Sequence, residues 1–353
     1  MHISSITLLH FLFLGMILKE TTMANSMSFL MLLSLLAFIP LCLCRTEGSL
    51  YPQYYDKSCP KVEQIVKSVL ARVVAKEPRM AASLLRLHFL DCFVKGCDGS
   101  LFLDSDSSRS IISEKESIPN RNSARGFEVI DEIKTALEKE CPHTVSCADI
   151  SALAARDSVV LAGGPSWKVA LGRRDSLNAS LSESNKNIPD PNSKFHTILT
   201  KFKLQGFEMV DQVALAGSHT IGYSRCISFN QRLYNHSGKG EPDPTLDKHY
   251  AAELRTKCPR SGGDKNLSPL DFVTPSKFDN SYYKNLMADN GLLNSDQILF
   301  TMNKESAEMV KLFAHSNDIW FEQFTKSMIK LGNLSPLTGS KGEIRKNCRK
   351  INT

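Results

Sequence analysis

One short loop of this chain gathers side chains that can bind a hard cation. Two carboxylates and a hydroxyl alternate there with backbone carbonyls, in the order Asp91, Val94, Gly96, Asp98 and Ser100. Ca²⁺ takes roughly six to eight oxygen ligands, usually from a compact loop of this kind. A disulfide between Cys92 and Cys97 would close the loop. The same composition is also typical of a plain turn, so the residues alone leave both interpretations open.

A positively charged side chain, that of Arg86, lies about one helical turn before this loop. Residues 79–92 are expected to form a helix, and positions four apart share a helix face, so Arg86 and Leu90 project together. Arg86 can stabilise negative charge that develops in a reaction. Leu90 can transfer no proton. His88 lies about 200° around the helix from Leu90 and cannot take its place, so we interpret it as a structural histidine.

The apolar segment 213–222 carries a single histidine, His219, near its end. A lone histidine on an apolar helix is most often a core residue with a satisfied ring. The alternative is a metal ligand, which needs an acceptor at its second ring nitrogen to fix the tautomer.

Helical periodicity dominates the rest of the chain. Helices are expected at 62–77, 79–92, 126–140, 146–161, 195–203, 209–218, 247–257, 279–289 and 304–331, and a short strand at 169–171. The sequence therefore predicts a mostly α-helical protein. Its 353 residues suffice for one large domain or two packed lobes.

The first 48 residues differ from the rest. Two apolar runs, Leu8–Leu18 and Phe29–Cys44, are short for a membrane span. We interpret the second as a secretory signal region that ends near residue 48, with a membrane anchor as the alternative. Translation from Met23 or Met27 would leave the first run outside the protein.

Charge and cysteines agree with an extracellular protein. The net charge of +6 suits work among acidic polymers and offers no basic cluster that would argue for nucleic acid. Eight of the ten cysteines follow residue 48, an even number that indicates disulfides, although spacing alone leaves about a hundred pairings open. Sequons at Asn178, Asn235, Asn266 and Asn333 fit secretion.

The segment from Arg86 to Ser100 closely resembles the distal haem-pocket motif of the plant secretory (class III) peroxidases. The resemblance runs from about Tyr51 to Cys348 and includes the blocks at 124–127, 145–149 and 163–175. It implies an all-α fold of residues 49–353, in which a distal and a proximal lobe sandwich one haem b. It also implies four disulfides: Cys59–Cys141, Cys92–Cys97, Cys147–Cys348 and Cys226–Cys258.

The resemblance assigns roles around the haem. His219 is expected to be the axial iron ligand, with the carboxylate of Asp296 as its hydrogen-bond acceptor. Arg86 stabilises the transition state, and Asn120 normally orients a distal histidine. In the family that histidine occupies the position of Leu90. Pro189 aligns with the entrance used by aromatic donors.

Two calcium sites are implied as well. The first is the loop described above, supported by Glu114. The second is expected at Thr220, Asp271, Thr274, the carbonyl of Lys277, and Asp279.

These expectations favour a secreted, monomeric peroxidase that reduces H2O2 with phenolic donors, impaired by Leu90. Acidic wall polysaccharide is a further partner that its charge would suit. A second hypothesis is a non-catalytic haem-binding glycoprotein of the cell wall. A third is a sequence error, since one base change turns a His codon into a Leu codon.

Overall fold

The computed structural model describes residues 49–353, which form one compact unit. The expected targeting region, residues 1–48, lies outside the described residues. Within the described part, no helix is long and apolar enough to cross a membrane. The unit is mostly helical, as the sequence predicts.

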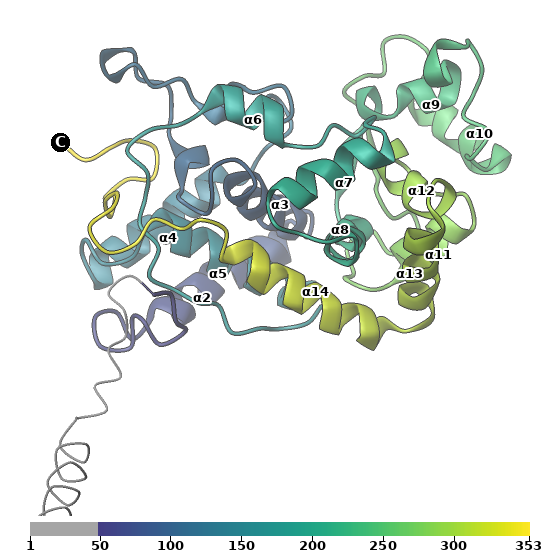
Figure 1. Ribbon diagram of the computed structural model, residues 1–353. Coiled ribbons are helices and arrows are strands. Elements are labelled where there is room, and N and C mark those ends of the chain that lie inside the picture. Colours follow the sequence, from purple (N-terminus) through teal and green to yellow (C-terminus); the bar gives the residue numbers. More distant parts are fainter. Residues whose placement is uncertain (1–48) are drawn as a thin grey trace, which may run out of the picture. The chain divides into compact units, whose positions relative to one another are not determined.

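Thirteen α-helices, together with short 3₁₀ helices, make up about half of the described chain (Figure 1). They are α2 (Val62–Lys76), α3 (Met80–Cys92), α4 (Phe127–Glu140), α5 (Cys147–Leu161), α6 (Leu181–Asn187), α7 (Phe195–Leu204), α8 (Met209–Ala216), α9 (Asn230–Tyr234), α10 (Lys248–Lys257), α11 (Ser281–Met287), α12 (Asn294–Thr301), α13 (Lys304–His315) and α14 (Asn317–Gly332). Short 3₁₀ helices include η1 (Ser100–Phe102), η3 (Glu114–Glu116) and η4 (Gly217–Thr220).

The alanine-rich helix α5 is the centre of one half of the molecule. Its small side chains let α2, α3 and α4 pack closely around it, and almost every residue of α5 is buried. Ser146 begins the helix, since its hydroxyl accepts a hydrogen bond from the backbone N–H of Asp149. This packing fixes α3, which carries Arg86 and Leu90.

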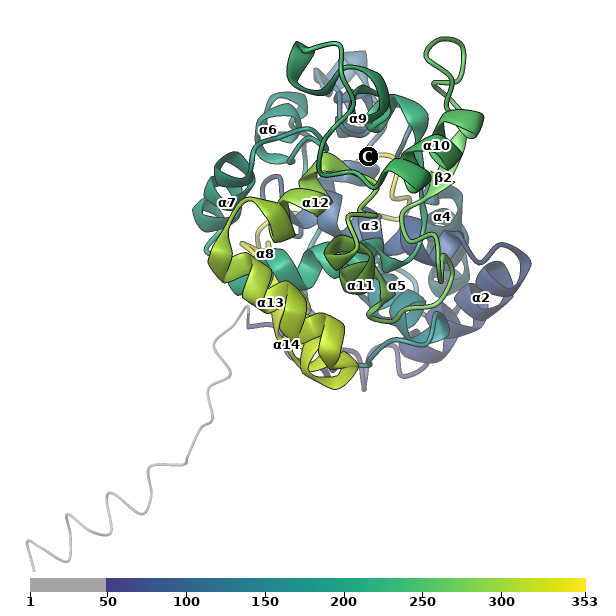
Figure 2. The ribbon, with the colours of Figure 1, turned by 90° about the vertical axis from the view of Figure 1, so that its right-hand side faces the viewer.

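The other half is built from α8 and α10 to α14. Helix α8 packs against α13 and α14, and α11 packs against α12 and α13. Figure 1 shows α10 to α13 at the right and α4 at the left, and Figure 2 views the side of α10 to α13 face on. These contacts position the 3₁₀ turn η4, which continues α8 and carries His219.

Two sequence expectations about secondary structure are wrong. The segment 304–331 is two helices, because Ser316 adopts an extended conformation and its side chain caps α14 by accepting from the N–H of Ile319. The expected strand at 169–171 forms no ladder; Leu171 makes one isolated bridge, to Tyr51. The single sheet of the described residues pairs β1 (Tyr223–Arg225) with β2 (Leu267–Pro269), antiparallel.

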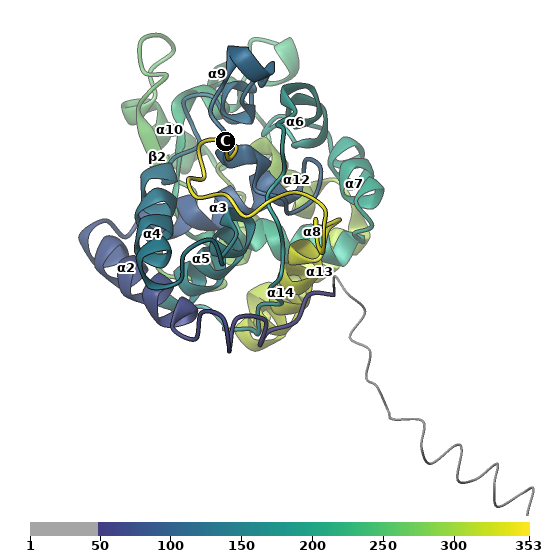
Figure 3. The same cartoon turned by 90° about the vertical axis from the view of Figure 1, so that its left-hand side faces the viewer.

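Four disulfides join the described chain, and all four pairings agree with the expectation. The longest link, Cys147–Cys348, ties the start of α5 to the C-terminal segment. That segment runs back across the side formed by α3, α4 and α6 (Figure 3). There Arg345 donates to the carbonyl of Gly99 at 2.8 Å, and the N–H of Cys97 donates to Leu334 at 3.0 Å.

Candidate functional site

His219 projects from η4 with one ring nitrogen held and the other free to bind. Its Nδ1 lies 2.8 Å from Oδ1 of Asp296, a buried residue of α12. This contact fixes the tautomer with the proton on Nδ1, so the lone pair of Nε2 points elsewhere. The His219 side chain is 38% exposed although it lies between buried segments. That arrangement suits an imidazole that ligates a metal.

Aromatic residues pack behind η4 and leave no room for larger side chains. A Cβ at Gly217 would lie 2.7 Å from Trp320, so only glycine fits there. Trp320 donates from Nε1 to the carbonyl of Ala214, and Tyr283 donates from its hydroxyl to the carbonyl of Val213. The turn that carries His219 is therefore held rigidly from behind.

Arg86 is held in place by two acceptors from the segment that follows η3. It donates from Nη2 to the carbonyl of Pro119 at 2.8 Å, and both Nη atoms lie 3.2 Å from Oγ of Ser123. Burial, reinforced by the charge of Arg225, lowers the pKa of Arg86 to about 10. Arg86 stays charged at neutral pH and can stabilise an anion.

Leu90 and Asn120 are both buried, and Asn120 has an unused acceptor. Its Nδ2 donates to the carbonyl of Glu114 at 3.0 Å and to Oγ of Ser184 at 3.3 Å. Its Oδ1 is buried and has no hydrogen-bond partner among the described residues. Buried polar atoms without partners are rare and costly, so this oxygen is suited to a hydrogen-bond donor that the described residues do not supply.

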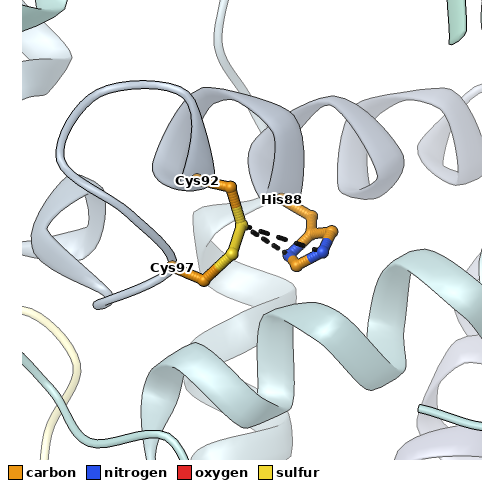
Figure 4. A group of neighbouring side chains, drawn as sticks. All are labelled: His88, Cys92 and Cys97. Atoms are coloured by element: carbon orange, nitrogen blue, oxygen red, sulfur yellow. Dashed lines mark hydrogen bonds between the residues drawn. A yellow bond between two sulfur atoms is a disulfide. The ribbon is translucent and has the colours of Figure 1, made fainter. Parts of the chain in front are cut away.

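His88 lies against the disulfide Cys92–Cys97 (Figure 4). It is two residues before Leu90 in α3, which places the two residues about 200° apart around the helix. Its Nδ1 is 3.6 Å from Sγ of Cys92. Burial, together with the charge of Arg173, lowers the pKa of His88 to about 3. These three side chains lie close enough to hold a metal, but both sulfur atoms belong to the disulfide. The structure thus places His88 as a neutral core residue, as expected.

The first oxygen-rich loop is a cluster of buried carboxylates. Burial and the nearby charge of Asp98 raise the pKa of Asp91 well above its usual range, and burial also raises the pKa of Asp98. Burial raises the pKa of Glu114 to about 7. One oxygen of Glu114 and the hydroxyl of Ser100 are buried and find no hydrogen-bond partner in residues 49–353. Such a cluster fits a bound cation, which would neutralise the carboxylates and satisfy both atoms.

Val94 and Gly96 lie in the same loop. The carbonyl of Val94 accepts from Nδ2 of Asn187 in α6 at 2.9 Å, and Gly96 has a φ of 116° that other residues rarely adopt. A Cβ at Gly96 would lie 2.8 Å from the carbonyl oxygen of Leu334. The close approach of the C-terminal segment therefore requires glycine here.

The second expected cluster converges next to His219. Oδ2 of Asp271 accepts from the hydroxyls of Thr220 at 3.0 Å and Thr274 at 3.2 Å, and Oδ1 of Asp279 accepts from Thr274 at 3.0 Å. The side chain of Lys277 forms an exposed ion pair with Asp279. Two carboxylates and two hydroxyls around one point are a donor set that a hard cation prefers.

Pro189 lies between α6 and α7 and is partly exposed. Its loop is tied to the helix of Asp296, because the N–H of Ser295 donates to the carbonyl of Pro191 at 2.9 Å.

Sequence reasoning missed Tyr282, which donates from its hydroxyl to Oδ1 of Asp296 at 3.0 Å. No spacing marks that tyrosine, since its partner belongs to another helix.

The residues fit a haem. His219 offers a free Nε2 supported by Asp296, and Oδ2 of Asp296 is a buried atom with no partner among the described residues. Arg86 is a fixed cation, carried by α3, which packs against η4.

Comparison with known proteins points to one family. The sequence model of the family described as "Peroxidase" matches residues 66–316. Peroxidase 72 of Arabidopsis thaliana is 64% identical over 335 residues, covering 94% of this chain and 99% of that protein. Peroxidase 49 of the same plant is 64% identical over 333 residues, covering 94% of this chain and 100% of that protein. Peroxidase 15 is 62% identical over 338 residues, with coverage of 94% and 99%.

Proposed function

This chain belongs to the peroxidase family, and from that membership we propose that it is a secreted haem protein that reduces H2O2 and oxidises phenolic donors, with the peroxide step weakened by Leu90. The observation that carries the proposal is the His219–Asp296 pair at 2.8 Å, on a turn packed rigidly against Trp320.

His219 and Asp296 act together at the proximal side. When one haem b is bound, it supplies the iron at which peroxide is reduced. His219 would hold it through Nε2, and the buried carboxylate of Asp296 accepts a hydrogen bond from Nδ1–H, which makes the imidazole a stronger electron-pair donor. A more basic axial ligand favours the oxidised iron at rest.

Arg86 acts at the distal side by binding charge. Its guanidinium, fixed by Pro119 and Ser123, stabilises the negative charge that develops as the O–O bond breaks. A base that moves the peroxide proton is typically worth about 10²–10⁴ in rate. That factor equals roughly 3–5.5 kcal/mol of activation free energy. Leu90 cannot contribute it, whereas Arg86 and Asn120 remain.

Two Ca²⁺ ions support this geometry. The distal ion binds at Asp91, Asp98, Ser100, the carbonyls of Val94 and Gly96, and Glu114 through water. The proximal ion binds at Thr220, Asp271, Thr274, Lys277 and Asp279. Each site adjoins a residue of the haem pocket, since Asp91 follows Leu90 and Thr220 follows His219. Loss of either ion would therefore loosen the helix end or turn that positions a pocket residue.

Secretion to the cell wall, as a monomer, is part of the same proposal. Four disulfides are typical of oxidising compartments. All four sequon asparagines are exposed, which suits glycosylation. The net charge of +6 would favour acidic wall polysaccharide.

The alternative is a haem-binding protein without efficient catalysis. Leu90 and the unpaired Oδ1 of Asn120 favour it, because the distal pocket retains the acceptor without a base for it to hold. The two functions differ in the rate at which the haem-loaded protein reacts with H2O2.

A haem titration and stopped-flow kinetics test the proposal. The mature chain should bind one haem, and H2O2 should then change its Soret band and drive oxidation of guaiacol. His219→Ala should lose the imidazole-ligated spectrum. If H2O2 does not change the Soret band of the haem-loaded protein, the non-catalytic alternative is favoured. An unchanged spectrum in His219→Ala would refute His219 as the axial ligand.

A further inference from the structure

A continuous series of aromatic side chains leads away from His219. The rings of His219 and Tyr282 are 6.3 Å apart between centroids, Tyr282 and Tyr283 are 5.0 Å apart, and Tyr283 and Trp320 are 5.4 Å apart. The series continues from Trp320 to Phe324 at 5.8 Å, and from Phe324 to Trp167 at 6.1 Å. We call Tyr282, Tyr283, Trp320, Phe324 and Trp167 the aromatic chain.

The aromatic chain ends at a surface pocket of about 500 Å³. Trp167, which is 8% exposed, lines this pocket together with residues from the start of the described chain and from α2 and α5. The other members of the chain near His219, Tyr282, Tyr283 and Trp320, are fully buried. Trp167 is thus the member through which the aromatic chain meets solvent.

We propose that Trp167 is a second oxidation site, where phenolic groups carried on molecules too large to enter the haem pocket give up electrons that pass along the aromatic chain to the His219 side. The inference rests on the proposed function, because H2O2 reduced at the haem is the oxidant. The rate of electron transfer falls steeply with distance. Such a route therefore requires an unbroken series of ring contacts.

The hydrogen bonds along the chain suit this role. An oxidised tyrosine must release its phenolic proton, and the hydroxyl of Tyr282 donates to the carboxylate of Asp296, which can accept it. The hydroxyl of Tyr283 donates only to backbone carbonyls, which cannot, so Tyr283 serves as a bridge. Phe324 bridges in the same way between the two tryptophans, which can lose an electron without losing a proton.

The pocket is suited to a neutral aromatic donor. The charges of its lining are balanced, since Asp56 and Glu63 are negative and Arg156 and Lys168 are positive. Arg156 is already engaged, since it donates to Glu63, Asp157 and the carbonyl of Trp167. A phenol fits this environment, because its ring can pack on Trp167 and its hydroxyl can bond to the polar rim.

The reaction balances with these components alone. One H2O2 takes up two electrons and two protons and becomes two waters. Two phenols each lose one electron through Trp167 and one proton to water, and become phenoxyl radicals. Trp167 is returned to its starting state after each electron.

The test uses the haem-loaded full-length mature protein treated with H2O2. The chain has only two tryptophans, so tryptophan oxidation can be assigned without ambiguity. Without a donor, freeze-quench electron paramagnetic resonance should detect a tryptophan radical, and peptide mass spectrometry should find oxygen added at Trp167. Both signals should be absent from haem-free protein. Both signals should be weaker at Trp167 in Trp320→Phe, because the electron would then have to cross two phenylalanine rings in succession. They should be retained in Tyr250→Phe, an aromatic change outside the chain at a buried residue that contacts Phe272.

A kinetic measurement with two donors tests the pocket. The donors are p-cresol and the same phenol attached to polyethylene glycol. In Trp167→Phe the ratio of the rate with the attached phenol to the rate with p-cresol should fall, and in Tyr250→Phe this ratio should not change.

The outcomes separate the inference from the proposed function. A Soret band that does not respond to H2O2 refutes the peroxide chemistry and the inference with it. A normal Soret response with Trp167 oxidised equally in Trp320→Phe, or with an unchanged donor ratio in Trp167→Phe, overturns the inference alone. Circular dichroism of Trp320→Phe confirms that its fold is intact.

Discussion

Tyr282 and His219 bond to the same atom, Oδ1 of Asp296, at 3.0 Å and 2.8 Å. Two donors on one carboxylate oxygen compete for its charge. Tyr282 therefore weakens the hydrogen bond that gives His219 its anionic character, and it is a positioning residue for the proposed axial ligand.

Removing the Tyr282 hydroxyl should strengthen the His219–Asp296 bond. In Tyr282→Phe the iron–histidine stretching frequency of the ferrous haem protein should rise, and the Fe(III) state should become harder to reduce. Resonance Raman spectroscopy and redox titration measure both. Tyr283→Phe is the matched control, because that hydroxyl donates to Val213 and not to Asp296. A lower frequency in Tyr282→Phe would contradict the argument.

Restoring a base at position 90 should restore peroxide activation. Leu90→His should raise the second-order rate with H2O2 by about 10²-fold or more, because a neutral imidazole could then move the peroxide proton. The rate should fall at acid pH as the imidazole becomes charged.

The free acceptor of Asn120 makes this prediction sharper. Its buried Oδ1 has no partner among the described residues and would accept from the new imidazole. Leu90→His combined with Asn120→Ala should lose part of the gain, whereas Asn120→Ala alone should change little. Leu90→Phe, which adds a ring without a base, is the control. A Leu90→His protein that binds haem without any gain in rate would favour the non-catalytic alternative.

Metal analysis should find two Ca²⁺ per chain after desalting. Asp91→Asn and Asp271→Asn should each reduce the count to one, because each removes a buried carboxylate from a different cluster. Asp106→Asn, at a partly exposed acid of the distal loop region, should leave the count at two. A count near zero in the unaltered protein would refute both sites.

His88 should make the fold less stable as the pH falls. Its pKa is about 3 in the folded protein, against about 6.5 when unfolded, so the unfolded chain binds one more proton between these values. Unfolding free energy should therefore fall on acidification through this window, by up to about 1.4 kcal/mol per pH unit from this residue.

Denaturant titrations between pH 4 and 7 measure the slope. His88→Gln should flatten it, whereas His196→Gln, at an exposed position, should not. Equal slopes in all three proteins would show that His88 does not contribute.

The helices that bury one face were predictable because their apolar residues recur at threes and fours. Helices α2, α4, α5 and α7 begin and end within a residue or two of the expected positions. Helices α6 and α12 were missed, since they are short and polar and depend on local caps and tertiary contacts. Ser180, for example, accepts from the N–H of Glu183 to begin α6. The break at Ser316 was missed because the apolar period continues across it.

Site residues that belong to a sequence motif could be predicted. Site residues that only the folded chain brings together could not. Asp296 was assigned by resemblance, although the helix that positions it was not expected. Tyr282 bonds to Asp296 and Trp320 packs against Gly217, from separate helices, and no spacing in the sequence relates them to His219. The pKa of His88 likewise depends on burial that no local pattern shows.

The bonds from the C-terminal segment to the distal loop set an order on biosynthesis. Arg345 and Leu334 hold Gly99 and Cys97, and Cys348 pairs with Cys147. The ribosome makes these partners after the residues that they hold, so the first-made half of the chain keeps this loop unheld and the Cys147 thiol unpaired until the partners have been made. A chain that stops before Arg345 would lack the partner of Cys147, and its defect would therefore lie about two hundred residues upstream of the missing part.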